Sequence, residues 1–395
     1  MNDALQVLRP GAAEESAQAI SRAARGVEPT RTVFTCAIGR KTSTAGHEAS
    51  TRHELARRLA RLLGYRYGGE HDPVAAQDAE AYFVPSDTLT SAVATSLGIR
   101  GAEDLFGGVV PSSFVATKTI THPLIDADAA APAGWCDEFP RLVAGSVLAG
   151  YSAFAKADAL KAGRRLLERG PVRVKLASGI AGMGQCVADD EAVLTQVLDK
   201  LTDEDVAAGL AIEENLVEVV THSVGCVRVA EMVATYCGVQ RQTANNDGAD
   251  VYGGSDLRVV RGGFSALLAL ELPVEVRLAI AQARVYDDAA DRCFRGFYAS
   301  RRNYDVAQGT DMKGRRHSGV LEQSWRAGGA SGAEIGALEA FRADASLHTV
   351  HAVSREIYGD GVSPPAGATV YFRGIDPKVG PLAKFTVVQP YADTR

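Results

Sequence analysis

The segment from Gly170 to Asp189 constrains the fold of this chain more than any other stretch. An apolar run carrying Lys175 near its end is followed by a glycine-rich loop, and a second apolar run begins at Gln185. Glycines let a backbone approach an anion closely, and a neighbouring lysine adds a positive charge that suits phosphate. We therefore expect a strand, a flexible loop and a second strand that together form a lid over a triphosphate.

The order of the residues in this loop excludes two other phosphate-binding loops. A P-loop carries Gly-Lys-Ser/Thr within the loop, and a dinucleotide fingerprint opens a helix with Gly-x-Gly-x-x-Gly. In this chain the lysine precedes the loop, the glycines Gly179, Gly182 and Gly184 read Gly-x-x-Gly-x-Gly, and the residues that follow favour a strand.

Composition narrows the class of protein further. A net charge of -6 argues against nonspecific nucleic-acid binding, and no apolar run approaches the length of a membrane span. The first residues lack the basic-then-apolar pattern of a signal peptide. Six scattered cysteines without a Cys-x-x-Cys pair fit reduced thiols better than disulfides or a zinc site. We expect a cytoplasmic protein that binds neither nucleic acid nor a membrane.

The first 110 residues predict a small parallel α/β domain. Strand candidates at Thr32–Ile38, Tyr65–Tyr67 and Ala81–Val84 alternate with helical patterns, one of which stops at Gly64. Ligands of open α/β sheets lie beyond the carboxyl ends of the strands, so the polar stretch 39–50 could border a pocket. The alternative is a solvated loop.

The middle of the chain mixes helices and strands in an α+β pattern. Residues 106–140 predict a connector with little regular structure, and 252–256 a turn. Beyond residue 345 only one strand candidate, 369–373, is evident. The helix candidates are 154–169, 191–201 and 274–292, and the strand candidates are 210–212 and two strands within 219–236.

Residues 301–326 predict an antiparallel hairpin with charged side chains on one face. Two alternating runs flank a polar turn, and residues two apart along a strand share a face. If the two faces coincide, carboxylates and guanidinium groups line one small region, as a magnesium–nucleotide complex requires. The alternative is a surface hairpin with solvated ion pairs. The residues are Arg301, Asn303 and Asp305 on the first strand, with Glu322, Ser324 and Arg326 on the second.

Together these segments resemble the ATP-grasp superfamily, which includes carboxylate–amine ligases and biotin carboxylases. The resemblance covers roughly residues 110–340 and implies ATP and Mg²⁺ as cofactors. Lys175 matches the family's phosphate-binding lysine, and Gly179, Gly182 and Gly184 match its lid. Lys118 is the candidate for an earlier phosphate lysine. Glu213, Glu214 and Leu216 resemble the hinge, whose backbone reads adenine while a carboxylate binds ribose.

In the hairpin, the resemblance assigns Asp305 and Glu322 to the metal, with Ser324 as a weaker third ligand. The family usually has asparagine at the position of Ser324, which puts tight binding of a second metal in doubt. Arg326 matches the terminal arginine, and Arg301 and Lys175 join it as candidate catalytic residues. The glycine-rich segment 328–331 could present backbone N–H groups to a substrate carboxylate, or form a tight turn.

The resemblance also implies an overall organisation and an activity. It implies a two-lobed ATP-grasp fold after a pre-ATP-grasp domain: residues 1–110, lobes at 111–210 and 211–345, and a C-terminal segment 346–395 packing on the fold. The implied enzyme activates a small carboxylate as an acyl phosphate and joins it to an amine, releasing ADP and phosphate. A kinase of a small molecule and a catalytically silent nucleotide-binding regulator remain alternatives. A homodimer is compatible with the family.

Overall fold

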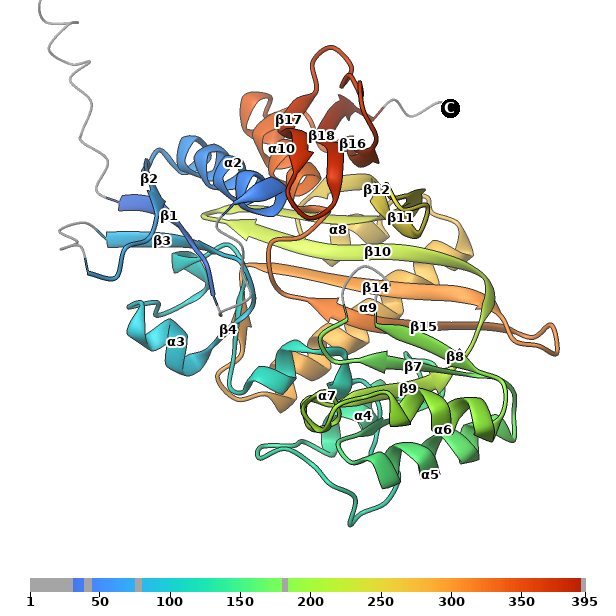
Figure 1. Cartoon of the computed structure of the whole chain (residues 1–395). Helices are drawn as coiled ribbons and strands as arrows, with labels where there is room; N and C mark the ends of the chain where they lie inside the picture. The colour runs from blue at the N-terminus through green and yellow to red at the C-terminus, as the bar shows by residue number, and fades with distance from the viewer. Residues whose placement is uncertain (1–30, 39–44, 75–79, 180–183, 392–395) are drawn as a thin grey trace, which may run out of the picture.

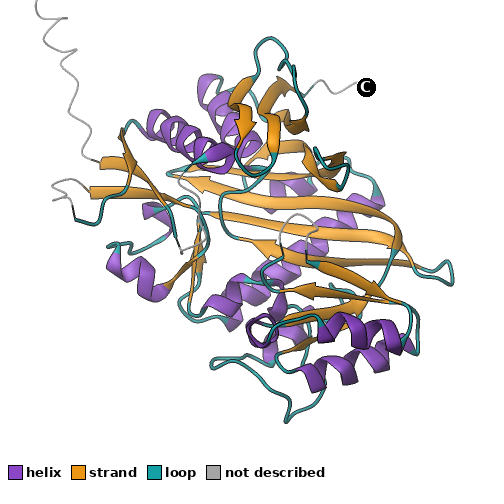
Figure 2. Ribbon diagram, viewed as in Figure 1, coloured by secondary structure: helices purple, strands orange, loops and turns teal. Residues whose placement is uncertain are grey.

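The chain folds into the expected α+β arrangement. The computed structural model describes residues 31–38, 45–74, 80–179 and 184–391 (Figure 1). Among these residues, no helix is long and apolar enough to cross a membrane. The layers described below lie around one large antiparallel sheet, with helices on both of its faces (Figure 2).

The N-terminal layer is a small parallel sheet, as the sequence predicts. Its strand order is β2-β1-β3, and both pairs are parallel. Helix α2 ends where Gly64 adopts a left-handed conformation (φ 72°) and its N–H bonds the carbonyls of the last turn. The elements are β1 (Arg31–Cys36), α2 (Gly46–Leu63), β2 (Arg66–Glu70) and β3 (Glu80–Pro85).

Residues 86–143 connect this layer to the rest of the fold. As expected for a connector, the regular elements are short, and three strands form a second small sheet in the order β13-β5-β4. The elements are β4 (Leu89–Thr90), α3 (Ser91–Ser96), η1 (Ala102–Asp104), β5 (Gly108–Val110), η2 (Ser113–Ala116), η3 (Lys118–Ile120), α4 (Glu138–Val143) and, later in the chain, β13 (Tyr298–Ala299).

The next lobe is a four-stranded antiparallel sheet that contains the predicted lid. Strands β7 and β8 pair as the two arms of the hairpin, and the order is β6-β9-β7-β8. The helices pack on this sheet around Leu194, Leu198 and Leu210. The elements are β6 (Gly150–Ala153), α5 (Lys156–Leu167), β7 (Val172–Leu176), β8 (Gln185–Ala188), α6 (Glu191–Asp199), α7 (Asp203–Ala208) and β9 (Leu210–Glu214).

The large sheet has eight strands in the order β15-β14-β10-β11-β12-β16-β18-β17. This sheet combines strands of the predicted second lobe (211–345) with the three strands of the C-terminal segment (346–395). Its elements are β10 (Val217–Val229), β11 (Met232–Ala244), β12 (Asp250–Arg261), β14 (Arg301–Thr310), β15 (Arg316–Ser324), β16 (Thr349–Tyr358), β17 (Thr369–Asp376) and β18 (Gly380–Pro390), with helices α8 (Phe264–Leu268), α9 (Val274–Cys293) and α10 (Ser331–Ala343).

Two sequence-based expectations are corrected here. The turn predicted at 252–256 is wrong, because these residues lie inside β12. The glycines there serve an irregularity in the pairing of β12 with β11, and Gly254 has a φ of 133° that few other residues adopt. The C-terminal segment holds three strands rather than the single predicted one, and all three join the large sheet.

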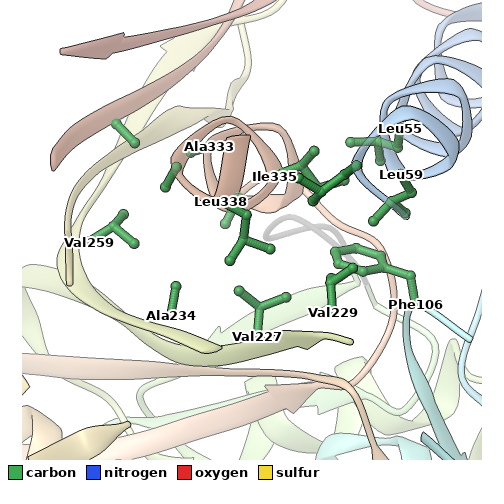
Figure 3. Packing of buried hydrophobic residues seen from close by; sticks show 14 of the residues in the cluster. Leu55, Leu59, Phe106, Val227, Val229, Ala234, Val259, Ala333, Ile335 and Leu338 are labelled. Carbon is green, nitrogen blue, oxygen red and sulfur yellow. The ribbon is translucent and has the colours of Figure 1, made fainter. Parts of the chain in front are cut away.

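Opposite faces of the large sheet are covered by different helices. On one face α10 lies between the sheet and α2, and Leu338 and Ile335 meet Val227 and Leu59 in one apolar cluster (Figure 3). On the other face α9 packs through residues such as Ile280 and Tyr286. The alternation of side chains along each strand supplies both faces. Asp305 lies on the face of α10, because its register partner Ser223 alternates with Gly225 and Val227.

Candidate functional site

The hairpin of β14 and β15 brings the predicted carboxylates together. Asp305 is the register partner of Glu322, and Asn303 is the partner of Ser324. The two predicted faces therefore coincide. Strand β15 ends at Ser324, so Arg326 lies just beyond the strand rather than on its face.

Lys118 joins this hairpin to the lid. Its ammonium lies 2.8 Å from Glu322 Oε2 and donates to the carbonyl of Gly179 at 2.7 Å. A third contact, to the carbonyl of Leu176, is 3.4 Å long. The Lys118 side chain is 6% exposed, so it is held between the base of the lid and a predicted metal ligand.

The loop that carries Lys118 is anchored from the opposite face of β15. The side chain of Gln323 donates to the carbonyls of Val115 (3.0 Å) and Thr117 (2.9 Å). The hydroxyl of Tyr286 on α9 donates to Gln323 Oε1 at 2.9 Å. Because adjacent strand residues point to opposite faces, Glu322 contacts Lys118 while Gln323 fixes the loop on which Lys118 lies.

Lys175 forms a buried group with two residues from other elements. Its ammonium pairs with Glu213 Oε1 on β9, and Glu213 Oε2 lies 3.2 Å from His122 Nε2. All three side chains are less than 5% exposed. Burial alone would raise the pKa of Glu213, but Lys175 and the hydrogen bond with His122 outweigh it and lower this pKa to about 2.

The hinge residues Glu213, Glu214 and Leu216 lie at the end of β9. The carboxylate of Glu213 faces Lys175 and His122, so its predicted contact with ribose would require it to leave both partners. Glu214 accepts from the Ala149 N–H at 3.1 Å and lies 3.1 Å from His317 Nδ1. Leu216 is buried. The nucleotide-binding roles of these three residues stay predictions.

Two of the three lid glycines are described. The Gly179 N–H donates to Leu176, and the carbonyl of Gly184 accepts from the Leu176 N–H at 3.0 Å. Gly184 has a φ of 71°, a left-handed conformation that closes the hairpin. Gly182 lies outside the described residues.

Asp305 lies beside a second carboxylate, that of its register partner Glu322. Burial, and then the charge of Glu322, raise the pKa of Asp305 to about 7. Asn303 donates to Asp305 Oδ1 at 3.2 Å. Mg²⁺ is usually held by one or two carboxylates together with substrate phosphates, so the Asp305–Glu322 pair fits it. Within the described ranges, no group of three or more His, Cys, Asp or Glu side chains could hold a metal.

Arg301 is buried and fully engaged with protein groups. Its guanidinium contacts Glu334 on α10 at 2.9–3.1 Å and donates to the carbonyls of Ser324 (3.0 Å) and Arg326 (2.6 Å). Burial would lower the pKa of Arg301, but Glu334 outweighs it and raises the pKa. Tyr236 donates to the same carboxylate at 2.6 Å. The geometry gives Arg301 a positioning role, and its predicted catalytic role stays a prediction.

Two residues at and just beyond the end of β15, Ser324 and Arg326, have capacity left for a ligand. Arg326 is 28% exposed, and its guanidinium lies 3.7 Å from Asp87 of the N-terminal half. Ser324 Oγ accepts from Arg301 at 3.2 Å, which leaves a further lone pair for a ligand. In the segment after Arg326, the Gly328 N–H donates to Ser331 Oγ at 3.0 Å.

Three residues that fix the predicted site residues in place, His122, Gln323 and Glu334, were not predicted from the sequence. The sequence carried a signal for Glu334, because at helical spacing it shares one face of α10 with Leu338 and Phe341, both buried. A carboxylate at a core position requires a buried partner. His122 and Gln323 had no such signal, since each depends on contacts between segments far apart in the chain.

Solved structures of other proteins resemble this chain over most of its length. Biotin carboxylase from Campylobacter jejuni, solved as a β-γ-ATP complex, matches with a TM-score of 0.51 and 12% identity over 92% of this chain and 88% of its own. Phosphoribosylglycinamide synthetase from Anaerococcus prevotii (TM-score 0.48, 11% identity) covers 93% and 95%. D-alanyl-alanine synthetase A from Vibrio cholerae (TM-score 0.48, 8% identity) covers 75% and 89%.

At these identities the likeness concerns the fold alone. No curated relative matches the sequence significantly. One family model, described as "Protein of unknown function (DUF3182)", matches residues 35–386, which is most of the chain. The predicted resemblance to ATP-grasp proteins is confirmed for the fold, as is the predicted fold class. The chain thus belongs to the DUF3182 family, and its structure has the ATP-grasp fold.

Proposed function

We propose that the protein is an ATP- and Mg²⁺-dependent ligase. It activates a small carboxylate as an acyl phosphate and joins it to an amine, with release of ADP and phosphate. The observation that carries the proposal is the position of Lys118, whose ammonium contacts both Glu322 in the β14–β15 hairpin and Gly179 in the lid. Lys118, the lid residue Gly179 and Glu322 come from three separate segments and meet at this point. Lys118 and Gly179 are predicted to bind the phosphates, and Glu322 the metal.

Some residues of the site would bind the nucleotide and the metal, and others would stabilise developing charge. Lys118 and Lys175 would neutralise the phosphates once each exchanges a carboxylate partner for a phosphate oxygen. Asp305 and Glu322 would hold Mg²⁺, with Ser324 beside them, and the bound ion would supply charge neutralisation at the phosphate oxygens. Arg326, next to the segment 328–331, would meet the oxygens of the acyl phosphate. Such catalysis is mainly positioning and electrostatic stabilisation.

Binding of a non-hydrolysable ATP analogue, measured by isothermal titration calorimetry with and without Mg²⁺, tests the first half of the proposal. We expect magnesium-dependent binding at micromolar strength. Glu322→Gln should lose that dependence while the protein stays folded, although its melting temperature should fall because Lys118 loses its carboxylate partner. Absence of binding to the wild-type protein under both conditions would contradict the proposal.

Release of phosphate tests the second half. A ligase releases inorganic phosphate in equal amount to ADP when a carboxylate and an amine are supplied together. A kinase would form ADP without free phosphate, and a silent nucleotide-binding protein would form neither. A cytoplasmic location and a homodimer stay predictions.

A further inference from the structure

The sheet face that carries Asp305 continues as a row of polar side chains into the C-terminal strands. We call this row the polar strip: Gln240, Tyr252, Ser255, Ser354, Glu356 and Lys384. Its members are joined by register, since Gln240 pairs with Ser255, Ser255 with Ser354, and Glu356 with Lys384. Directly paired residues share a face, as do residues two apart on one strand. The strip therefore lies on one side of the sheet.

The strip begins next to the proposed metal site. Ser223 is the register partner of both Asp305 and Gly238, and Gln240 follows Gly238 by two residues on the same face. A side-chain hydrogen bond from Gln240 favours the charged form of Asp305. The first member of the strip therefore touches a residue assigned to Mg²⁺.

Tyr252 links the strip to the segment after Arg326. Its hydroxyl lies 2.7 Å from Ser255 Oγ and 3.4 Å from Ser354 Oγ. A Cβ at position 329 would overlap the Tyr252 ring, so Gly329 lets the segment 328–331 lie directly on it. Burial raises the pKa of Tyr252, and Glu356 and Asp305 are both near enough to raise it further.

The strip ends in two opposite charges that are largely removed from water. Lys384 Nζ lies 2.7 Å from Glu356 Oε1, and these side chains are 15% and 12% exposed. Lys384 Nζ also lies 3.5 Å from Nδ1 of His47, in the first turn of α2. Burial, and then the charge of Lys384, lower the pKa of His47. A neutral His47 that accepts from Lys384 at Nδ1 keeps a proton at Nε2 for donation.

This end of the strip therefore offers groups of both charges side by side. Lys384 has three N–H donors, and a carboxylate such as Glu356 has about four acceptor positions, so neither is saturated by the other. Charges held away from water are costly unless they are well paired, and a ligand of matching charges can improve that pairing. An isolated anion or cation would leave one of the two without its partner.

We propose that the end of the polar strip binds the α-amino-acid group of a substrate. Glu356 takes the ammonium, while Lys384 and the Nε2–H of His47 take the carboxylate. The reacting end of the same molecule then points toward Arg326. This inference rests on the proposed ligase function and narrows its substrate to molecules that end in an α-amino-acid group.

The direction of the substrate follows from the strand order. Strands β10, β11 and β12 lie between β14 and β16, and neighbouring strands are about 4.8 Å apart. The charged pair is thus too far from Asp305 to hold the reacting atoms themselves. It recognises the opposite end of the molecule.

Thermal shift measurements with the common L-α-amino acids, each at millimolar concentration, test this site directly. We expect at least one probe to raise the melting temperature of the wild-type protein. The amide and the N-acetyl form of that probe should not, since each lacks one charge. The inference is overturned if no probe stabilises the protein, or if a singly charged form stabilises it equally well.

Variants separate binding from a merely structural ion pair. Glu356→Gln and Lys384→Gln should each weaken probe binding about 10-fold or more, as loss of a charge-assisted contact does. The double exchange E356K/K384E should recover the melting temperature lost in the single variants but not the probe binding, because the polarity is reversed. Recovery of both would overturn the inference.

A matched control exists at the same junction. Arg58 on α2 pairs with Glu339 on α10, and their side chains are 13% and 27% exposed. Glu339→Gln breaks an ion pair of α2 away from the strip and should leave probe binding unchanged. Binding of the ATP analogue is measured in parallel: probe binding without analogue binding refutes the ligase function alone, and the reverse refutes the amino-acid site alone.

Discussion

Each proposed phosphate-binding lysine is paired with a carboxylate. Lys175 pairs with Glu213, and Lys118 pairs with Glu322. Lysine carries a strongly hydrated point charge, and burying it without a partner is costly. The carboxylates therefore hold both ammonium groups in position.

Replacing Lys175 by alanine should weaken ATP binding roughly 10- to 150-fold, since a charge-assisted contact contributes about 1.5–3 kcal/mol. Calorimetric titration with the ATP analogue measures this change. The variant also leaves the buried carboxylate of Glu213 without its lysine partner, so the melting temperature should fall. The double variant K175A/E213Q should recover stability but not affinity. Unchanged affinity in a folded K175A protein would contradict the assignment.

Mg²⁺-dependent nucleotide binding should strengthen as pH rises through about 7. The metal requires the ionised form of Asp305, whose pKa is raised to about 7 by burial and by Glu322. Affinity should therefore increase about 10-fold between roughly pH 6 and 8. Titrations at several pH values measure the slope. In Asp305→Asn only the ionisation of the nucleotide itself should remain, and an identical slope in both proteins would argue against this role.

The same raised pKa has a consequence for stability. The folded protein binds the Asp305 proton more tightly than the unfolded chain does. Without metal, this group therefore lowers the free energy of unfolding as pH rises from about 4 to about 7. Glu213 acts in the opposite sense, because its pKa is lowered to about 2. Its stabilising contribution is present above about pH 4.5 and is lost as pH falls toward 2.

At the scale of elements, strand β15 serves two purposes with adjacent residues. Glu322 faces Lys118, and Gln323 faces the backbone of the loop that carries Lys118. Gln323→Ala should therefore raise the KM for ATP several-fold by releasing this loop. Gln308→Ala is a matched control, because Gln308 on the same hairpin donates to the carbonyl of Glu275 at 2.8 Å on α9. Both variants should lose about 1–3 kcal/mol of stability. A KM that changes equally in both would contradict a specific role for Gln323.

Helix α10 fixes the end of β15 through Glu334 and Arg301. Glu334→Gln should lower the free energy of unfolding by about 3–5 kcal/mol, because it leaves the buried Arg301 without its charge partner. Denaturant unfolding measures this loss. Glu339→Gln on the partly exposed side of the same helix should cost about 0–1 kcal/mol. Comparable losses in the two variants would show that the Arg301–Glu334 pair does not stabilise the fold.

The sequence predicted elements well where local patterns agreed with burial. The lid hairpin, the β14–β15 hairpin and α9 all appear at their predicted positions. The turn predicted at 252–256 was wrong, because the glycines there allow an irregular register between β11 and β12 and the chain does not reverse. Residues 346–391 looked uninformative because Ser354, Glu356 and Lys384 put polar groups on the face where a core strand would be apolar.

For the whole molecule, the C-terminal strands are part of the core. Val350 and Ala352 on β16 and Tyr371 on β17 belong to the same apolar cluster as Leu338 of α10 and Leu55 of α2. The C-terminal segment is therefore part of the central sheet and its core, and does not only pack against them. It completes the central sheet and also supplies half of the polar strip.

Deletion of residues 344–395 should prevent folding. The truncation exposes the edge of β12 and the apolar face of α10, both of which favour aggregation. Soluble expression and circular dichroism of the truncated chain, beside the full chain, measure the effect. A soluble, folded truncation that binds the ATP analogue as tightly as the full chain would contradict this prediction.

The sequence by itself determined the hairpin around residues 172–188 and the placement of Lys175, Asp305 and Glu322 on strands, because these features depend on residue types and on periodicity within one segment. The α+β class and the choice of Lys118 came from the resemblance to the ATP-grasp superfamily. Only the tertiary structure decided the pairing of Lys175 with Glu213 and of Arg301 with Glu334, and the junction of His47 with Lys384. Buried charges take whichever partners the packing of distant elements brings within reach, and no local pattern carries that information.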